Sequence, residues 1–320
     1  MLSTAMDHLK SQPFLVLLLS FIGFISFFKN SFIFLKWIFI TFFRNSKNLK
    51  SYGSWALITG STDGIGKAFA FQLAQKDNLN LILVARNLSK LQQVSAEIKA
   101  QNPNTQIKIV VLDFSGDLST GIQKMKKAVE RLDIGVLINN VGVTYPGAMF
   151  FHEVDENIWK NIVKVNLEGA TLVTMAVLPG MIRRRKGAIV NMGSGASIVV
   201  PSHPLFAIYA ATKAYIDQLS RCLYVEYEHH GIDVQCQVPL YVKTKMTSRV
   251  ASIERSTLFS PSAEKYAKAA VGQIGYGGRR MPYWPHSLQW WFASLLPEPL
   301  LDAWRLSIGL SRRNDKHNIY

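Results

Sequence analysis

Short runs of β-branched and aliphatic residues alternate with longer amphipathic stretches from Trp55 onward, and this alternation restricts the fold more than any other feature of the sequence. Strands joined by helices form βαβ units, in which neighbouring strands run parallel. Strands are expected at residues 56–59, 79–85, 107–113, 136–139, 187–192 and 233–238. Helices are expected at residues 66–76, 89–100, 118–131, 156–178 and 209–228. The pattern therefore predicts an α/β fold with a doubly wound parallel sheet.

The first fifty residues are much more apolar than the rest of the chain. Residues 11–28 carry no charge, and residues 11–43 contain only two charged side chains, Lys29 and Lys36. This length suits one crossing of a bilayer. The stretch is too long for a secretory signal peptide, and no small-residue cleavage site follows it. We therefore predict a membrane anchor with a basic flank over residues 1–50, formed by one tilted helix or by a hairpin broken near Lys29 and Asn30.

Charges on either side of the apolar stretch predict its orientation. Three basic residues follow it directly: Arg44, Lys47 and Lys50. On the other side Asp7 and Lys10 cancel. By the positive-inside rule, the chain after the anchor lies in the cytosol. Only two cysteines occur in the chain, Cys222 and Cys236, which agrees with a reducing compartment and excludes a disulfide scaffold.

The rest of the chain divides into a domain and an extension. No linker rich in Gly, Ser or Pro interrupts residues 51–272, so they are expected to form one domain. Residues 273–320 form a C-terminal extension. Its apolar stretch at residues 287–310 suits an acyl groove, a membrane-facing helix or a segment that covers the core.

The formal net charge of +15 indicates anionic partners, such as a phosphate-rich ligand or a membrane surface. Basic residues are dispersed and no nucleic-acid recognition motif accompanies them, so no nucleic-acid partner is expected. The basic runs at residues 183–186 and 279–280 either attract such an anion or are solvated surface.

A glycine cluster directly follows the first predicted strand. In this context glycines allow a tight turn and a close approach of the backbone to a pyrophosphate, while the N–H groups of the next helix face the phosphates. The spacing of the glycines is compatible with a nucleotide site and also with a plain strand-to-helix turn. The candidate residues are Gly60, Ser61, Thr62, Asp63, Gly64, Ile65 and Gly66.

The second predicted strand ends in Arg86, at the position where an acidic residue would bind the adenine ribose of NAD. An arginine there favours the 2′-phosphate of NADP(H). The alternative is a solvated surface arginine, and the negative charge of Asp63 in the turn weakens the preference slightly.

Tyr209 and Lys213 lie four residues apart at the start of a predicted helix, so their side chains share one face. Carbonyl reduction needs a proton donor, and an ammonium group beside a phenol stabilises the phenolate that remains. Ser194 and Asn140 each follow a predicted strand, and Asn166 lies on the helix between them. Ligands of doubly wound sheets bind at these carboxyl ends of the strands.

These residues occur in the order typical of the short-chain dehydrogenase/reductase family, which the chain resembles over residues 51–245. The resemblance implies a Rossmann fold, an NADPH cofactor and no metal. It implies four catalytic residues: Asn166, Ser194, Tyr209 and Lys213. Tyr209 would be the general acid, Lys213 would lower its pKa and hold the nicotinamide ribose, Ser194 would position the carbonyl, and Asn166 would support a water relay to Lys213.

Further cofactor contacts are also implied by the resemblance. Asp113 would touch the adenine, and Val242 and Thr244 lie in the segment that would meet the nicotinamide carboxamide. Asn140, Tyr209 and Lys213 are also expected to bind the cofactor. Two departures from the family pattern stand out. Ser194 precedes Tyr209 by two residues more than is usual, so Ser197 competes for the same role, although we favour Ser194 because it directly follows a strand. Leu240 stands where the family has glycine.

Within the family, the anchor and the segments at residues 237–242 and 281–286 resemble membrane-bound very-long-chain 3-oxoacyl-CoA reductases, particularly the plant form. The resemblance implies NADPH-dependent reduction of a 3-oxoacyl-CoA to the 3-hydroxyacyl-CoA in fatty-acid elongation, at the endoplasmic reticulum membrane with the catalytic domain in the cytosol. Its partners would be a long-chain acyl-CoA, other elongase subunits and, in a homodimer, a second copy. The end of the chain, residues 314–320, lacks the lysine-rich retrieval tail of many relatives.

Two other functions stay open from the sequence. A membrane-bound 17-beta-type hydroxysteroid dehydrogenase would use the same Ser194, Tyr209 and Lys213 on a flat apolar ketone. A non-catalytic paralogue would keep the fold as a scaffold in an elongase assembly.

Overall fold

The computed structural model describes residues 13–317. Asp7 and Lys10 of the predicted anchor flank, and the last three residues of the C-terminal end, lie outside this range. The chain divides into two compact units, one up to Asn45 and the other from Ser46 onward.

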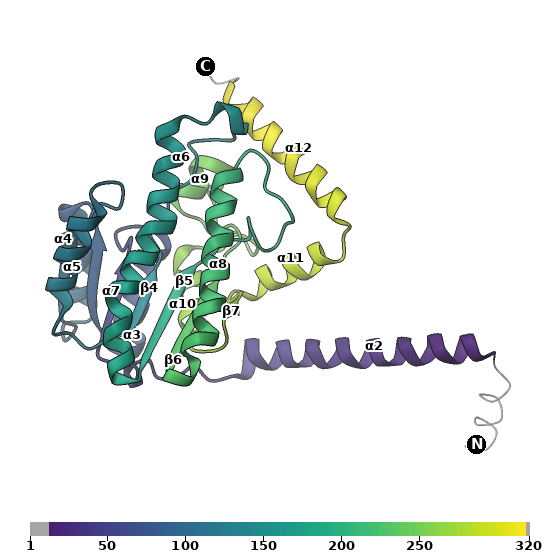
Figure 1. Cartoon of the computed structure of the whole chain (residues 1–320), viewed down its shortest axis with the longest axis horizontal. Helices are drawn as coiled ribbons and strands as arrows, with labels where there is room; N and C mark the ends of the chain where they lie inside the picture. The colour runs from purple at the N-terminus through teal and green to yellow at the C-terminus, as the bar shows by residue number, and fades with distance from the viewer. Residues whose placement is uncertain (1–12, 318–320) are drawn as a thin grey trace. The chain divides into compact units, whose positions relative to one another are not determined.

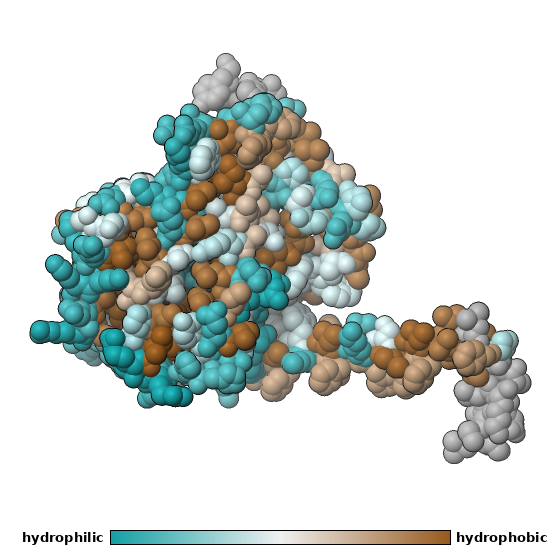
Figure 2. Space-filling view, viewed as in Figure 1, coloured by the Kyte–Doolittle hydropathy of each residue, from teal (hydrophilic) through white to brown (hydrophobic). Residues whose placement is uncertain are grey.

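In the described part of the N-terminal unit, the residues from Phe14 to Phe43 form one continuous helix. Helix α2 (Phe14–Ile38) continues as a π-helical turn, η1 (Phe39–Phe43), and it does not break at Lys29 and Asn30, so the hairpin is not formed. Large apolar side chains are exposed along its length, as the brown spheres on α2 in Figure 2 show. The 28 residues from Val16 to Phe43 form a candidate membrane span. At 1.5 Å per residue they measure about 42 Å, so a hydrocarbon core of about 30 Å would require a tilt.

The second unit is built on a seven-stranded parallel sheet with strand order β3-β2-β1-β4-β5-β6-β7. The part of the sheet from β4 to β7 is labelled in Figure 1. The strands are β1 (Trp55–Thr59), β2 (Asn80–Ala85), β3 (Ile107–Val111), β4 (Ile134–Asn139), β5 (Gly187–Met192), β6 (Ile232–Gln237) and β7 (Arg279–Arg280). The predicted doubly wound α/β fold is confirmed. Strand β7 was not predicted, because two arginines carry no strand pattern, and it extends the sheet with residues from the C-terminal extension.

Helices cover both faces of the sheet. One layer contains α3 (Gly64–Asp77), α4 (Leu88–Gln101) and α10 (Ala263–Val271). The other contains α5 (Leu118–Val129), α7 (Gly169–Arg184) and α8 (Ala207–Tyr227). The helix predicted at residues 156–178 forms as α6 (Glu156–Val163), a π-helical turn η4 (Lys164–Glu168) and α7. Its apolar residues span enough length for a membrane, but half of them are buried in this unit against the sheet.

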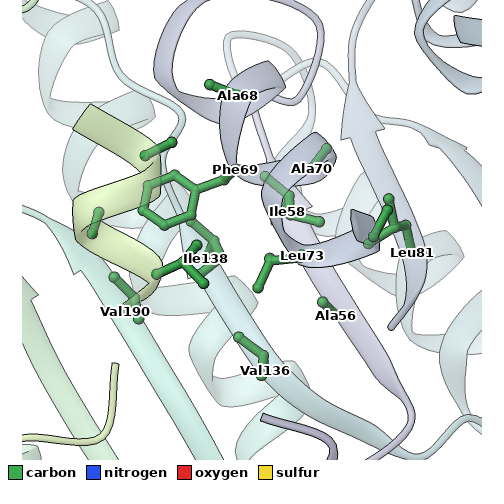
Figure 3. Packing of buried hydrophobic residues seen from close by; sticks show 14 of the residues in the cluster. Ala56, Ile58, Ala68, Phe69, Ala70, Leu73, Leu81, Val136, Ile138 and Val190 are labelled. Carbon is green, nitrogen blue, oxygen red and sulfur yellow. The ribbon is translucent and has the colours of Figure 1, made fainter. Parts of the chain in front are cut away.

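Alternation along the strands separates the two cores. Ile58 and Ile138 point to the α3 side, where Phe69 and Leu73 of α3 pack on them (Figure 3), whereas Leu57 points to the other side. All five side chains are fully buried. Truncating one such side chain to alanine typically costs about 2–5 kcal/mol of stability. The sheet is therefore a rigid frame whose strand ends hold the loops of the site.

The C-terminal extension forms two helices, α11 (Trp284–Ser294) and α12 (Glu298–His317). Pro285 stands at the start of α11, and the sequence between the helices carries Pro297, so no continuous second span forms. Helix α12 is bound to the rest of the unit through polar side chains. Asp302 accepts a hydrogen bond from Ser202, and Arg313 pairs with Glu153.

Candidate active site

Two cavities meet at Ser194 and Tyr209, which line both. The first, which we call the strand-end cavity, lies at the carboxyl ends of β1, β4, β5 and β6. Ten of the predicted site residues line it: Gly60, Asp63, Gly64, Ile65, Asn140, Ser194, Tyr209, Lys213, Val242 and Thr244. Its position between β1 and β4, where the strand order reverses, is where dinucleotides bind in sheets of this kind.

The glycine turn between β1 and α3 fits a pyrophosphate. Gly60 and Gly64 have left-handed φ angles of 66° and 52°, which L side chains rarely adopt. A Cβ on Gly66 would collide with the Gly60 carbonyl and with the side-chain amide of Asn140. The buried Ser61 hydroxyl has no hydrogen-bond partner among the described residues. A turn that presents close backbone and an unused hydroxyl at a helix N-terminus is suited to phosphate oxygens.

Asp63 caps this helix, since its carboxylate accepts from the Gly64 N–H at 2.8 Å. It also forms an ion pair with Lys245 at 2.9 Å. Burial disfavours its charged form, but the hydrogen bonds with Lys245 and Gly64 hold the pKa of Asp63 below its usual range. The negative charge in the turn is thus compensated by a lysine of the same cavity.

Arg86 and Asp113 lie farther along the same edge of the sheet, after β2 and β3, and both are exposed. They do not line the strand-end cavity, and neither do Ser61, Thr62 or Gly66. Hydrogen bonds from Ser115 are the main cause of the lowered pKa of Asp113, and the charge of Arg86 lowers it further. The two candidate adenine-side residues are therefore neighbours.

Asn140 positions the glycine turn. Its Nδ2 donates to the carbonyls of Thr59 at 3.1 Å and Gly60 at 3.3 Å, and its own N–H donates to Thr59 Oγ1. Val242 is buried, and Thr244 caps the short helix α9 (Lys245–Ala251). These contacts connect the segments after β1, β4 and β6 into one wall.

Tyr209 and Lys213 lie one helical turn apart on α8, as the sequence predicts. Lys213 Nζ lies 5.9 Å from the centre of the Tyr209 ring and donates to the Met192 carbonyl at 2.9 Å. The lysine is only 6% exposed, and burial lowers its pKa to about 8. Burial raises the pKa of Tyr209, while a hydrogen bond with Ser194 opposes the rise. At neutral pH the site therefore holds a phenol beside an ammonium.

Asn166 lies in the π-helical turn η4 and is buried. Its Nδ2 donates to the Val143 carbonyl at 2.9 Å and to Thr212 Oγ1 at 3.1 Å, and its Oδ1 accepts from the Val143 N–H. A Cβ on Gly142 would lie 3.4 Å from Asn166 Oδ1 and 3.5 Å from Lys213 Nζ. Asn166 and Lys213 thus face a common space beside Gly142, with no direct bond between them.

The sequence departs from the family pattern in the spacing between Ser194 and Tyr209 and at Leu240, and the structure shows how each position is arranged. Ser194 hydrogen-bonds Tyr209 and accepts from the Ala196 N–H at 3.1 Å, whereas Ser197 donates to the Ser194 carbonyl and lines neither cavity. The extra residues before Tyr209 lie in a loop that lines the second cavity. Leu240 has no left-handed φ, packs on Gly195 and lines both cavities.

The second cavity, which we call the apolar cavity, is formed by segments far apart in the sequence. Most of its wall is apolar, and its lining includes Val199, Val200, Phe206, Val250, Ala293 and Trp304. Helices α11 and α12 therefore cover a cavity, which is one of the roles expected of the extension. Sequence reasoning missed four polar residues of its wall: His203, Tyr241, Arg305 and Arg312. The only sequence signal is the seven-residue spacing of the arginines, which places them on one face of a helix.

The two basic runs have structural roles. Arg279 forms an ion pair with the buried Asp217, and Arg280 donates to the Tyr276 carbonyl. Arg184 pairs with Asp133 at 2.7 Å and donates to the Ile134 carbonyl. The sequence did not predict these internal partners, and the attraction of an anion by the basic runs stays a prediction.

A Rossmann sheet with a glycine turn, a tyrosine and a lysine at its switch point defines a dinucleotide-dependent oxidoreductase. A model of the short chain dehydrogenase family matches residues 54–255, more than half of the chain. The protein belongs to the short-chain dehydrogenase/reductase family, which confirms the resemblance drawn from the motifs.

Its relatives include a very-long-chain 3-oxoacyl-CoA reductase-like protein of Arabidopsis thaliana, 56% identical over 95% of this chain and 97% of that protein. The very-long-chain 3-oxoacyl-CoA reductase of Mus musculus is 41% identical over 82% of this chain and 81% of its own length. The inactive hydroxysteroid dehydrogenase-like protein 1 of Homo sapiens is 42% identical over 78% of this chain and 74% of its own. A solved short-chain dehydrogenase from Sphingobium yanoikuyae in complex with NADPH is 27% identical, with a TM-score of 0.61, and the match covers 68% of this chain and 83% of that one.

Proposed function

We propose that the protein reduces the 3-oxo group of a very-long-chain 3-oxoacyl-CoA to a 3-hydroxyacyl-CoA in fatty-acid elongation, with NADPH as cofactor and Tyr209 as general acid. The observation that carries the proposal is the meeting of the two cavities at Ser194 and Tyr209. One cavity has the phosphate-binding turn, and the other is apolar enough for an acyl chain. The similarity to very-long-chain 3-oxoacyl-CoA reductases supports the choice of substrate.

NADPH, when bound in the strand-end cavity, supplies the hydride. The glycine turn and Ser61 would hold its phosphates, Arg86 and Asp113 its adenine end, and Lys213, Val242 and Thr244 its nicotinamide end. The fit rests on the left-handed glycines and the unpartnered Ser61 hydroxyl described above.

Tyr209 then protonates the carbonyl oxygen as negative charge develops on it. Because burial raises the pKa of Tyr209, the phenol keeps its proton until negative charge develops on the substrate oxygen and the proton is transferred to it. Ser194, which is hydrogen-bonded to Tyr209, orients the same oxygen. The ammonium of Lys213 stabilises the phenolate that remains, and Asn166 shares a space with Lys213 in which a water would return the proton.

The first experiment measures NADPH oxidation by the detergent-solubilised full chain with a long-chain 3-oxoacyl-CoA. The Tyr209→Phe variant should lose about 10³-fold in kcat, since general acid catalysis contributes on that order, while its NADPH affinity stays within about threefold. Tyr215→Phe on the same helix is the matched control, because that hydroxyl hydrogen-bonds Thr171 at 2.9 Å and Tyr215 lines neither cavity.

Two outcomes would contradict the proposal. Oxidation of NADPH with a 17-ketosteroid but not with the acyl-CoA would assign the site to a hydroxysteroid. Binding of NADPH without turnover of either substrate would point to a non-catalytic protein, like the inactive relative.

We also propose that α2 anchors the protein in the endoplasmic reticulum membrane with the residues from Ser46 onward in the cytosol. The apolar helix, in which only Lys29 and Lys36 are charged, and the basic Arg44, Lys47 and Lys50 that follow it support this orientation. Protease added to intact microsomes should digest the second unit without detergent, and protection of that unit would contradict the orientation. The proposed partners extend to other elongase subunits and to a second copy of the chain.

A further inference from the structure

Two arginines of α12 project to the wall of the apolar cavity. Arg312 Nη1 donates to the Tyr241 hydroxyl at 2.8 Å, and its guanidinium carbon lies 5.3 Å from the centre of the Tyr241 ring. Arg305 is close enough to Tyr241 for its charge to lower the pKa of that phenol. Its Nη2 lies 3.0 Å and 2.9 Å from the two ring nitrogens of His203. Two guanidinium groups therefore lie near a single phenol.

These positive charges lack a negative partner in the part of the chain that the structure describes. Among the described side chains, no carboxylate lies within 4 Å of Arg305 or Arg312. Arg305 is only 7% exposed, and its buried Nε has no hydrogen-bond partner among the described residues. A buried charge without a partner is costly, so the site is favourable for an anion.

The surroundings respond to this excess of positive charge. Burial and the charges of Arg305 and Arg312 lower the pKa of His203 to about 3, so the imidazole is neutral and adds no competing charge. Burial raises the pKa of Tyr241, but the two arginines outweigh burial and bring it below its usual value. The lowered pKa values of His203 and Tyr241 thus both indicate a positive local potential, which favours negatively charged groups.

Arg313, the next residue after Arg312, shows the contrast. It pairs with Glu153 through two hydrogen bonds and does not line the apolar cavity. Arg313 therefore fastens α12 to the domain. Arg305 and Arg312 of the same helix line the apolar cavity instead. Fastening the helix does not require Arg305 and Arg312 to converge on Tyr241.

We propose that Arg305, Arg312 and Tyr241 form an anion site that binds the phosphate groups of the coenzyme A portion of the substrate. The proposal rests on the proposed function, because the acyl chain and thioester of a 3-oxoacyl-CoA are neutral and its phosphates are its only charges. Guanidinium forks bind phosphate oxygens in bidentate pairs. A neutral ketone such as a steroid has no group for this site.

The site is placed to act together with the reacting carbonyl. Tyr241 is close enough to Tyr209 for its charge to raise the pKa of Tyr209, whereas the arginines lie on Tyr241. Tyr209, Tyr241 and both arginines line the same cavity, so one extended ligand could contact them together.

The test is direct binding of coenzyme A to the full chain in detergent, measured by calorimetry in the absence of turnover. Arg312→Gln should weaken coenzyme A binding about tenfold, and Arg305→Gln at least as much. Arg131→Gln, which removes the same charge at an exposed position outside the cavity, should stay within about twofold. Tyr241→Phe removes a single hydroxyl of the proposed site. It replaces Arg305→Gln in the test if that variant, at a buried position, does not fold. Pantetheine, which has no phosphate, should bind with little dependence on Arg312.

A kinetic measurement sharpens the assignment. The ratio of kcat/KM for a 3-oxoacyl-CoA to that for the N-acetylcysteamine thioester of the same acyl group should fall about tenfold in Arg312→Gln. Equal weakening of coenzyme A binding by the Arg312 and Arg131 variants would overturn the proposal. A loss of decanoate binding in Arg312→Gln, with coenzyme A binding unchanged, would overturn it in favour of a carboxylate.

The two proposals can fail separately. If the wild type reduces no 3-oxoacyl-CoA but its coenzyme A binding depends on Arg312, the proposed function fails and the anion site stands. If the wild type reduces a 3-oxoacyl-CoA and Arg312→Gln binds coenzyme A as tightly as the wild type does, the proposal of the anion site fails and the proposed function stands.

Discussion

The strand-end cavity and the apolar cavity share Ser194 and Tyr209, but their walls come from different parts of the chain. The first is formed mainly by turns that directly follow strands, and its central turn takes only seven consecutive residues, 60–66. The second combines the loop after β5, the segment after β6, α9 and the late helices α11 and α12. A cofactor shared by a whole family is bound by local backbone geometry, whereas a particular substrate is bound by side chains that only packing brings together.

Each cavity also contains a buried cation, and the two cations differ in how their charge is accommodated. Lys213 is 6% exposed and donates to a backbone carbonyl, and burial lowers its pKa to about 8. Arg305 is 7% exposed, and an arginine does not lose its proton in proteins. The lysine can therefore lose its charge above about pH 8, while the arginine keeps its charge.

The largest effect that separates the two cations is expected for Lys213→Met. The fall of the lysine pKa from 10.5 to about 8 corresponds to about 3 kcal/mol. Below pH 8 the wild type carries this cost in the folded state, so the variant should be more stable by up to about that amount. Between about pH 8 and 10.5 the unfolded chain binds more protons than the folded one, and wild-type stability should rise relative to the variant.

Urea unfolding of the full chain in detergent at pH 7 and pH 9.5 measures this difference. Lys126→Met, at an exposed position on α5, is the control and should show no such pH dependence. A difference between wild type and Lys213→Met that does not change with pH would mean that the lysine is not the source of the cost.

The difference between the two cavities also explains which parts of the fold and site could be predicted from the sequence. Parallel strands alternate with helices in a pattern that burial on both faces imposes, so the six longer strands could be predicted within a few residues, and Ser194 could be preferred over Ser197 because it directly follows β5. The roles of Ser194, Tyr209, Lys213 and Asn166 stay predictions, although the structure brings these four residues together.

The apolar cavity could not be predicted for a physical reason. Arg305 and Arg312 lie about a hundred residues after Ser194, and nothing in their local sequence tells which cavity α12 will cover. The basic runs were more conspicuous, yet Arg184 and Arg279 have internal acidic partners. Clustering of charge along the sequence therefore does not show which arginines are paired, because pairing depends on partners that are distant in the sequence.

The smallest expected effect concerns Arg86, the one residue proposed to choose the cofactor, which lies outside the strand-end cavity as the structure outlines it. It is exposed at the end of β2, beside Asp113, so its contact with a 2′-phosphate would be partly screened. Arg86→Ala should therefore weaken NADPH binding only about tenfold, equivalent to about 1.4 kcal/mol, and leave NADH binding nearly unchanged.

Fluorescence titration of both nucleotides compares the two affinities in the same protein. Arg131→Ala removes an exposed arginine between α5 and β4, at the opposite end of the sheet, and should change neither affinity. Equal losses for NADPH and NADH would show that Arg86 acts through general attraction or through Asp113. In that case the choice between NADPH and NADH would depend on other residues, which packing brings to the site from distant parts of the sequence. The strand-end cavity would then resemble the apolar cavity in this respect.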